Sequence, residues 1–522
     1  MATEEGGRVP EMTGENTAAR MVAADGRPLK RSLARALRRE KLRALMLIAP
    51  LLIFILVAFV APIVDMLFRS VENGIVSDTL PRTTAALEDW DPEEAELPPD
   101  AVYDAFYTDL VVAEELKLHT RLGTRLNYEL TGISSMFRST GRAVGRFETD
   151  IYTDQFIAAD PEFERPVAWV AWMNDDAVRE ALPQTASAWE GWRDMLDDSG
   201  DEAGEEDVPD FVFAALYRDA LAGGLPDALP QVDVSGFESV SIREQFAEAD
   251  EEWLDPEVWE TIKVFSPDYT PGYFLNSADL QLTPQGSIEQ RPEGDRIYMT
   301  LFGRTMWMSL VITVSCILLG YPVAWMLANL PMRSANLLMI LVLLPFWTSL
   351  LVRTSAWKVL LQQQGVINDI LVWAHIISDG NRLVMINNAT GTIIAMTHIL
   401  LPFMILPLYS VMKTIPPSYL RAAKSLGATN WTAFWRVYFP QSVPGIGAGS
   451  ILVFILAIGY YITPELVGGT KGVFISNRIA YHISQSLNWG LAAALGTILL
   501  VLVLLLYWVY DKLVGIDNVS LG

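Results

Sequence analysis

The residues with the most informative types and spacing lie in a basic segment between two apolar runs, residues 413–442. Arg421-Ala422-Ala423 is followed by Leu426-Gly427 and, nine residues after that glycine, by Val437-Tyr438-Phe439-Pro440. The two alanines leave room for a close contact, and Gly427 permits a turn between two short helices. Pro440 stiffens the exit toward the next apolar run. The pattern permits two short helices with a turn between them, although an isolated Ala-Ala-x-x-x-Gly also occurs at ordinary helix ends.

Residue patterns that carry catalysis or bind cofactors are not found elsewhere in the chain. Gly468-Gly469-Thr470-Lys471-Gly472 lacks the spacing of a nucleotide-binding phosphate loop, so ATP hydrolysis is not expected here. The single cysteine, Cys316, excludes an intrachain disulfide. The histidines are scattered and form no zinc-binding pattern: His119, His375, His398 and His482. We therefore expect neither a metal site, nor a resident cofactor, nor a nucleic-acid partner.

Six apolar runs must position the basic segment, and each is long enough to cross a bilayer. They are Ala44–Phe68, Thr305–Leu327, Ala335–Val352, Gly391–Met412, Val443–Thr463 and Gly490–Tyr510. Gly445, Gly447 and Gly449 give the fifth run a small-residue face suited to close helix packing. His398 lies within the fourth run and is expected to form a hydrogen bond with a neighbouring helix. The chain is thus predicted to be an all-α membrane protein.

Basic residues set the expected orientation of these spans. Residues 27–43 contain many Arg and Lys directly before the first span, which places a cytoplasmic tail at 1–43. The first 26 residues read as disordered. A cleaved signal peptide is the alternative for the first run, but that run is longer than a typical signal sequence. Six spans return the C-terminus to the cytoplasm, place 413–442 inside and place 70–300 outside. Arg353 and Lys358 then fall on the outer side, against the charge bias.

The charge of the chain is divided very unevenly. Residues 70–300 contain 50 acidic and 15 basic residues, a balance of −35, whereas the remaining residues carry +11. Within this acidic region, residues 71–265 read as a mainly helical soluble domain. Six tryptophans there can fill a core or line a ligand cleft: Trp169, Trp172, Trp189, Trp192, Trp253 and Trp259. The acidic surface itself could be a solvated exterior, a docking face for a binding protein, or an attractor of cations.

Three further segments accompany the basic segment and together resemble one family. They are Pro345–Trp357 (PFWTSLLVRTSAW), Leu400–Tyr409 (LLPFMILPLY) and Thr463–Gly469 (TPELVGG). With the 413–442 segment, which is similar to the EAA loop of ABC importer permeases, they resemble the spermidine/putrescine importer permeases of the PotB type. The resemblance covers residues 44–70 loosely and 266–515 closely, and it does not cover the acidic insert.

The resemblance implies a MetI-like type I importer fold of six spans, with its main transmembrane domain at 301–515, in the bacterial inner membrane. It implies a second, homologous permease subunit, two ATP-binding subunits that hold ATP and Mg²⁺, and a periplasmic solute-binding protein. It also implies that the EAA loop couples to the ATPase through Arg421, Ala422, Ala423, Leu426, Gly427, Val437, Phe439 and Pro440. The family usually has glutamate where this chain has Arg421, which puts that one contact in doubt.

The substrate implied by the resemblance is a polyamine, an elongated cation that carboxylates and aromatic faces can bind. Glu465, Tyr460, Tyr461, Trp347 and Trp357 are the candidates for its pathway. Relatives often carry an acid at the position of Tyr460, so an opine, an amino-phosphonate or ferric ion remains an alternative cargo. A membrane sensor with an outer ligand-binding domain is a third possibility, disfavoured by the short tail after Tyr510.

Overall fold

The computed structural model describes residues 29–283 and 285–514. It divides the chain into two compact units, 1–66 and 67–522. The first unit contains α1 (Leu29–Ile55), the π-helical turn η1 (Leu56–Val60) and the beginning of α2 (Ala61–Arg69). These segments form one apolar helix over Glu40–Arg69, which is long enough to span a membrane and contains the predicted first run. Residues 1–28 of the predicted cytoplasmic tail lie outside the described residues.

The acidic region folds into short helices, as expected. Its α-helices are α3 (Ile75–Thr79), α4 (Pro81–Glu88), α5 (Asp100–Glu115), α6 (His119–Leu126), α7 (Ile133–Val144), α8 (Asp150–Ala159), α9 (Pro166–Met173), α10 (Asp176–Ala181), α11 (Pro183–Ser199), α12 (Asp210–Gly223), α13 (Ile242–Ala249) and α14 (Pro256–Val264). Its 3-10 turns are η2 (Pro161–Glu164), η3 (Val234–Gly236) and η4 (Glu251–Leu254). We refer to this part of the chain, residues 71–270, as the outer helical domain, after the location that the sequence predicts for it.

Some of the acidic residues of this domain begin helices. Asp160, Asp175 and Asp255 each accept a hydrogen bond of 2.9 Å from the backbone N–H two residues later. The first N–H groups of a helix have no partner within the helix, so a short carboxylate stabilises the helix start. Part of the acidic composition therefore serves the local fold.

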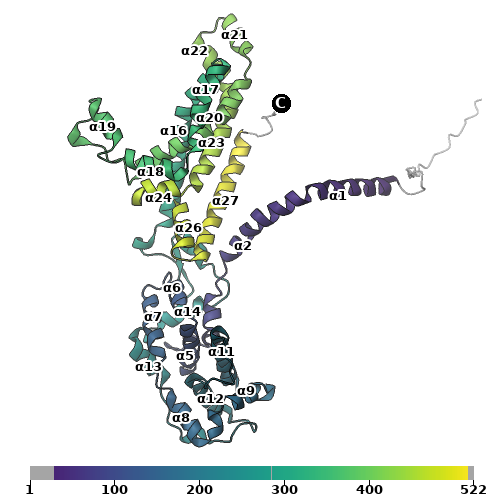
Figure 1. The fold of residues 1–522 in the computed structure, drawn as a ribbon, viewed down its shortest axis with the longest axis vertical. Helices are drawn as coiled ribbons and strands as arrows, with labels where there is room; N and C mark the ends of the chain where they lie inside the picture. The colour runs from purple at the N-terminus through teal and green to yellow at the C-terminus, as the bar shows by residue number, and fades with distance from the viewer. Residues whose placement is uncertain (1–28, 284, 515–522) are drawn as a thin grey trace, which may run out of the picture. The chain divides into compact units, whose positions relative to one another are not determined.

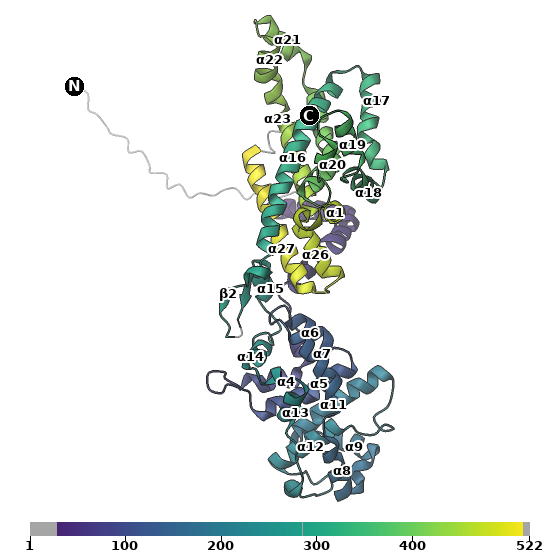
Figure 2. The ribbon, with the colours of Figure 1, turned by 90° about the vertical axis from the view of Figure 1, so that its left-hand side faces the viewer.

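The core of the outer helical domain is built around α5, which contacts α4, α6, α7, α11, α12 and α13 (Figure 2). Phe106 of α5 packs against Phe137, Trp253 and Trp259, with ring centroids 4.6–6.0 Å apart. The six tryptophans named above are all buried, with exposed fractions of 0–7%. Of the two interpretations that the sequence left open, the structure supports the one in which the tryptophans fill a core.

The two ends of the outer helical domain meet. Glu72 and Tyr269 form an isolated antiparallel bridge. On either side of it, the Asn73 N–H donates to the Asp268 carbonyl at 2.7 Å and the Thr270 N–H donates to the Val71 carbonyl at 2.8 Å. The chain thus leaves and returns at one place, an arrangement that allows a whole domain to be inserted.

A short connection leads from this domain into the membrane part. It consists of α15 (Gly272–Ser277), strands β1 (Leu280–Leu282) and β2 (Ile288–Gln290), and the 3-10 turn η5 (Glu293–Asp295). The strands form an antiparallel hairpin, with Leu280 opposite Gln290. The hairpin is not expected from the sequence. Before it, the Asp279 carboxylate accepts hydrogen bonds of 2.9 Å from the N–H groups of Tyr298 and Met299, so it caps the next long helix.

The membrane part contains the remaining helices. Its α-helices are α16 (Tyr298–Asn329), α17 (Met332–Leu343), α18 (Leu350–Leu360), α19 (Val366–Trp373), α20 (Ala389–Thr414), α21 (Pro417–Ser425), α22 (Asn430–Ala433), α23 (Phe439–Gly459), α24 (Ile462–Val467), α25 (Gly469–Gly472), α26 (Ile475–Ser484) and α27 (Trp489–Val514). The connecting turns are the 3-10 segments η6 (Leu344–Trp347) and η7 (Asp379–Asn381) and the π-helical segment η8 (Phe434–Tyr438).

Helices α16, α20 and α23 form the centre of this part (Figure 1). Close approach depends on glycines: a Cβ on Gly449 of α23 would lie 2.6 Å from the Met404 sulfur of α20, and one on Gly445 would lie 3.0 Å from the Cβ of Val411. The prediction of close packing along this face is confirmed at both glycines.

The third predicted span is interrupted, and the fifth, Val443–Thr463, runs past the end of α23 at Gly459 into α24. The run Ala335–Val352 is not one helix, because Met332–Trp347 and Leu350–Leu360 meet at an angle of 95°. Pro345 cannot donate a backbone hydrogen bond, and the Ser349 hydroxyl accepts one from the Val352 N–H at 3.2 Å, which starts a new helix. The described residues hold five single helices long and apolar enough to span a membrane, and six spans if the bent pair counts as one. The all-α membrane fold is confirmed, with these corrections to its third and fifth spans.

Candidate functional site

The predicted coupling loop forms two short helices, α21 and α22, joined at Gly427. The Gly427 N–H donates to the Lys424 carbonyl and the Ala428 N–H donates to the Ala423 carbonyl, each at 3.0 Å. This pair of bonds is a Schellman ending, which needs a left-handed residue directly after the helix. Gly427 has φ +91°, and the Thr429 hydroxyl then caps α22 by accepting from the Thr432 N–H at 3.2 Å. The loop therefore has a defined turn rather than an irregular one.

The coupling loop presents apolar side chains to its surroundings. Leu426, at the end of α21, is 90% exposed, and Trp431 of α22 is 72% exposed. Tyr419 is also exposed, whereas Ala423 is half-buried. Figure 1 shows α21 and α22 at the end of the long helices away from α26. Exposed apolar side chains gathered in one place are typical of an interaction surface.

The second half of the loop is fixed to the helix bundle by aromatic side chains. Phe439 lies 4.8 Å from the Trp435 ring and 5.9 Å from the Tyr321 ring of α16, centroid to centroid. The Tyr321 hydroxyl is 2.9 Å from the Ser442 hydroxyl. Val437 is half-buried, and Pro440 occupies the first turn of α23, where a missing N–H costs nothing. A force applied to α22 would thus reach α16 and α23 through packed rings.

The loop contains four basic residues, and one of them, Lys413, donates to the Ala328 carbonyl of α16 at 3.4 Å. Arg421, Lys424 and Arg436 are all exposed. Among residues 29–283 and 285–514, no carboxylate forms an ion pair with any of the three. Their charges are therefore available to an acidic surface outside this chain.

The predicted pathway residues lie in or beside two broken helices. Tyr460 and Tyr461 form the break between α23 and α24, and Trp347 precedes the bend between α17 and α18. Helices α18 and α24 pack together, and the hydroxyls of Thr354 and Thr463 lie 3.2 Å apart between them. Broken helices that meet within a membrane protein leave backbone groups free of helix hydrogen bonds, as in solute sites of transporters.

Trp357 is held in place by His398. The Trp357 indole N–H donates to His398 Nδ1 at 3.1 Å, and the ring centroids are 5.3 Å apart. This bond joins α18 to α20 and confirms the expected contact of His398 with a neighbouring helix. Nearby in the sequence, the buried Nε of Arg353 has no hydrogen-bond partner among the described residues. Arg353 was not among the predicted pathway residues. The sequence did offer a signal for it, because a basic residue beside an apolar run is unusual.

Glu465 and Trp347 lie apart from this pair. The Glu465 carboxylate accepts a hydrogen bond of 2.6 Å from the Asn477 side chain, which also donates to the Tyr461 carbonyl at 2.9 Å. Glu465 is exposed, and Trp347 is 71% exposed. Within the described ranges, no hydrogen bond or ring contact joins either residue to Trp357. Asn477 was not predicted, and nothing in its local sequence indicates its contact with Glu465.

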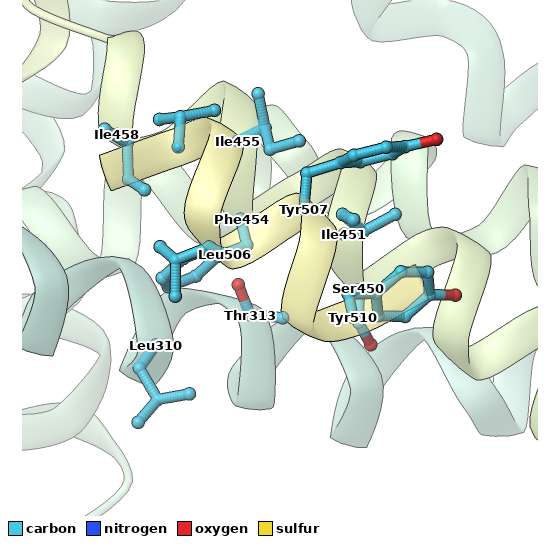
Figure 3. Close-up of a pocket in the computed structure, with 11 residues that line it drawn as sticks. Leu310, Thr313, Ser450, Ile451, Phe454, Ile455, Ile458, Leu506, Tyr507 and Tyr510 are labelled. Carbon is cyan, nitrogen blue, oxygen red and sulfur yellow. The ribbon is translucent and has the colours of Figure 1, made fainter. Parts of the chain in front are cut away.

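A cavity of about 220 Å³ lies between α16, α23 and α27. Figure 3 shows Leu310 and Thr313 of α16, Phe454 of α23, and Tyr507 of α27 around it. Its lining is mostly apolar, and it includes none of the predicted pathway residues. Among the described residues, no group of three His, Cys, Asp or Glu side chains could hold a metal ion.

Comparison with known proteins gives a family match for the membrane part. Residues 297–514 match the family described as "Binding-protein-dependent transport system inner membrane component". The outer helical domain lies outside that match.

Individual relatives cover the same length of chain. The spermidine/putrescine transport system permease protein PotB of Salmonella typhimurium (strain SL1344) is 37% identical over 224 residues, which are 42% of this chain and 77% of that protein. The inner membrane ABC transporter permease protein YdcU of Escherichia coli (strain K12) is 34% identical over 224 residues, which cover 41% of this chain and 70% of that protein. This chain also aligns with a crystal structure of a bacterial alginate ABC transporter in complex with alginate pentasaccharide-bound periplasmic protein. The TM-score is 0.37 and the sequence identity is 17%, and the alignment covers 43% of this chain and 81% of that chain.

Proposed function

The chain belongs to the family of binding-protein-dependent transport system inner-membrane components, and we propose that it imports polyamines as one subunit of an ATP-driven transporter. Members of this family are multi-pass permeases of ABC importers, so the chain is a transport protein and not an enzyme. The observation that carries the cargo assignment is the 37% identity to permeases named for spermidine and putrescine, over 77% of their length.

The complete transporter would contain four further subunits. A second, homologous permease subunit would pack beside this one, and two ATP-binding subunits would hold ATP and Mg²⁺ on the cytoplasmic side. A periplasmic solute-binding protein would deliver the polyamine. In this arrangement both termini lie in the cytoplasm and residues 70–300 lie in the periplasm. The basic coupling loop supports that orientation, since short basic loops remain cytoplasmic.

The coupling loop would transmit ATPase movement to the spans. Leu426 and the Ala422–Ala423 face of α21 would lie in a groove of the ATPase, while Arg421 would meet an acidic side chain there. Because α22 is followed directly by the ring cluster of Trp435, Phe439 and Tyr321, a displaced loop would move α23 and α16 together. A packed interface of this kind passes motion on because it has discrete arrangements rather than continuous ones.

The broken helices would form the polyamine pathway. Glu465 supplies a carboxylate for an ammonium group, and Tyr460, Tyr461, Trp347 and Trp357 supply aromatic faces that attract cations. The contact between α18 and α24 supports a common site, because it brings the Trp357 helix beside the helix that carries Glu465. Arg353, in the same helix as Trp357, would oppose a cation and would have to keep its charge turned away from it.

ATP hydrolysis by the assembled complex tests this function directly. With the binding protein present, spermidine and putrescine should stimulate hydrolysis by the reconstituted transporter, and Glu465→Gln should raise the concentration needed for half stimulation. Gln keeps the side-chain oxygen that accepts from Asn477, so a folding defect is not expected. Stimulation by an opine, an amino-phosphonate or ferric ion instead would retain the importer and replace its cargo.

A further inference from the structure

Asn477 contacts the break between α23 and α24 from the first turn of α26. Its Nδ2 group donates to the Tyr461 carbonyl at 2.9 Å and to the Glu465 carboxylate at 2.6 Å. The Tyr461 carbonyl also accepts from the Glu465 N–H at 3.0 Å, in the first turn of α24. One side chain thus binds both the backbone of the break and the acidic side chain that follows it.

The orientation of the Asn477 amide is fixed by its oxygen. This oxygen accepts from the Phe474 N–H at 2.9 Å, the bond by which the third residue of a helix satisfies the residue before its start. If the amide turned over, its NH₂ group would face the Phe474 N–H and that donor would lose its acceptor. Asn477 is 7% exposed, so water could not readily replace the bond. The NH₂ group is therefore directed toward Tyr461 and Glu465.

The start of α26 is itself anchored, so Asn477 has a rigid support. The Ile475 N–H donates to the buried Thr305 hydroxyl of α16 at 2.9 Å. The Ser476 hydroxyl donates to the Tyr460 carbonyl at 2.7 Å, and Ser476 is 8% exposed. Three consecutive residues therefore join α26 to α16 and to the break. Supporting bonds of this kind hold a functional side chain in one geometry.

The Glu465 carboxylate is oriented by this contact but keeps its charge. Asn477 is a neutral donor, and no ion pair among residues 29–283 and 285–514 includes Glu465. The amide engages Oε2 only, whereas Oε1 accepts no hydrogen bond from the described residues, and Glu465 is exposed. A carboxylate held at one oxygen by a neutral group, with its charge uncompensated and its other oxygen open, is suited to bind an ammonium group.

From these contacts we infer that Asn477 is the positioning residue for Glu465, an inference that rests on the proposed polyamine pathway. The amide holds Oε2 against the helix break and thereby presents Oε1 to the cationic cargo. Asn477 acts through Glu465 and has no assigned contact with the cargo. Its hydrogen bond has an ionised acceptor, which makes it stronger than a bond between neutral groups, and a small displacement of the charged group would slow passage of the cargo.

Putrescine uptake by proteoliposomes that contain the complete transporter tests this role. The rate is measured with saturating ATP and cargo-loaded binding protein, and each variant is made with Glu465 present and with Glu465→Gln. Asn477→Ala should lower the rate by about tenfold when Glu465 is present. It should lower the rate by about twofold or less in the Glu465→Gln background, because the charge that it positions is then absent.

Ser476→Ala is the matched control, because it also removes a donor to the break but has no contact with Glu465. Its effect on the rate should be the same factor in both backgrounds. The inference is overturned if Asn477→Ala also lowers the rate by one factor in both backgrounds, as a role confined to holding the break requires. Unchanged uptake in Asn477→Ala would overturn it as well.

Carbodiimide labelling of Glu465, read by mass spectrometry, needs no cargo and so separates this inference from the proposed function. Loss of a donor to the carboxylate raises its pKa, and carbodiimides react with the protonated carboxyl group. Labelling should therefore be about threefold faster or more in Asn477→Ala, and as slow in Ser476→Ala as in the unchanged chain. With this result, an assembled complex that imports no putrescine would contradict the cargo alone. Equal labelling in the two variants would overturn the positioning role.

Discussion

Gly427 determines the direction in which the coupling helices leave one another. Its φ of +91° is open to glycine at no steric cost, whereas a side chain there costs roughly 1–2 kcal/mol. No atom lies within 4 Å of an added Cβ, so the cost is purely conformational. Gly427→Ala should therefore accelerate amide hydrogen exchange over residues 421–433 by about fivefold or more. Gly145→Ala, at φ −71° and also without close neighbours, is the control. Equal acceleration in both variants would contradict this explanation.

Leu426 and Arg421 should contribute to ATPase docking for different reasons. Burying an exposed leucine stabilises a complex by about 1.5–3 kcal/mol, so Leu426→Ala should weaken ATPase binding by roughly tenfold. Arg421→Glu should also weaken it, and that loss should shrink as salt is raised, because charge interactions at a surface are screened. Affinity of the purified permease complex for its ATPase, measured at low and high salt, separates the two effects.

Two exposed residues of the same types serve as controls for docking. Leu221→Ala lies in the outer helical domain, and Arg333→Glu lies at the start of α17, outside the coupling loop. Neither should change ATPase affinity. If Arg421→Glu binds the ATPase as tightly as Arg333→Glu at low salt, no acidic partner faces Arg421.

The helix α5 contains a buried tyrosine whose ionisation opposes folding. Burial raises the pKa of Tyr107 to about 12, against an ordinary value of about 10, and its hydroxyl lies 2.7 Å from that of Thr149. Below pH 10 both the folded and the unfolded forms are protonated. Between pH 10 and 12 only the unfolded form loses the proton, so stability falls over this window, by roughly 2–3 kcal/mol in total.

Tyr107→Phe should therefore flatten the decline of the unfolding free energy between pH 10 and 12. The reason is that unfolding of the variant releases about one proton fewer in this pH range. The variant also loses the hydrogen bond to Thr149, which lowers stability at every pH and leaves the slope unaffected. Unfolding midpoints measured across this pH range report the slope. Tyr269→Phe, whose side chain is 70% exposed, is the control and should leave the slope as it is. An unchanged slope in Tyr107→Phe would mean that this group ionises normally in the folded protein.

The membrane helices show which elements can be predicted from sequence. Apolar runs mark the spans because the bilayer requires a certain length of apolar helix, and the runs 305–327, 391–412 and 490–510 each lie within one helix. The bend of 95° after Trp347 was missed, since hydropathy does not change where a helix turns aside. Pro345 and the Ser349 cap were local signals of that break. The Schellman turn at Gly427, in contrast, could be expected from spacing alone.

Contacts between distant segments could not be predicted. The Arg125–Tyr273 hydrogen bond joins residues 148 positions apart, and the Tyr298–His482 contact joins residues 184 apart. No local pattern indicates either pairing, because the first depends on how α6 packs beside α15 and the second on how α16 packs beside α26. The burial of the six tryptophans, on the other hand, followed from the size of the domain and its need for a core.

At the scale of the whole molecule, the outer helical domain is separable from the transport machinery. Its ends meet at Asn73 and Asp268, and its hydrophobic core contains no side chain from the spans. We expect its acidic surface to be a solvated exterior. Replacing residues 75–260 by a short glycine linker should therefore preserve ATPase binding and leave polyamine affinity unchanged. A large loss of affinity with intact ATPase binding would instead identify a docking face for the binding protein or an attractor of cations.

Uptake of labelled putrescine and spermidine tests the central claim most directly. A cell deficient in polyamine import would express the complete transporter together with its binding protein. The account predicts ATP-dependent uptake that Leu426→Ala reduces strongly and Leu221→Ala leaves intact. An assembled complex, with all subunits present in the membrane, that takes up neither polyamine would contradict it.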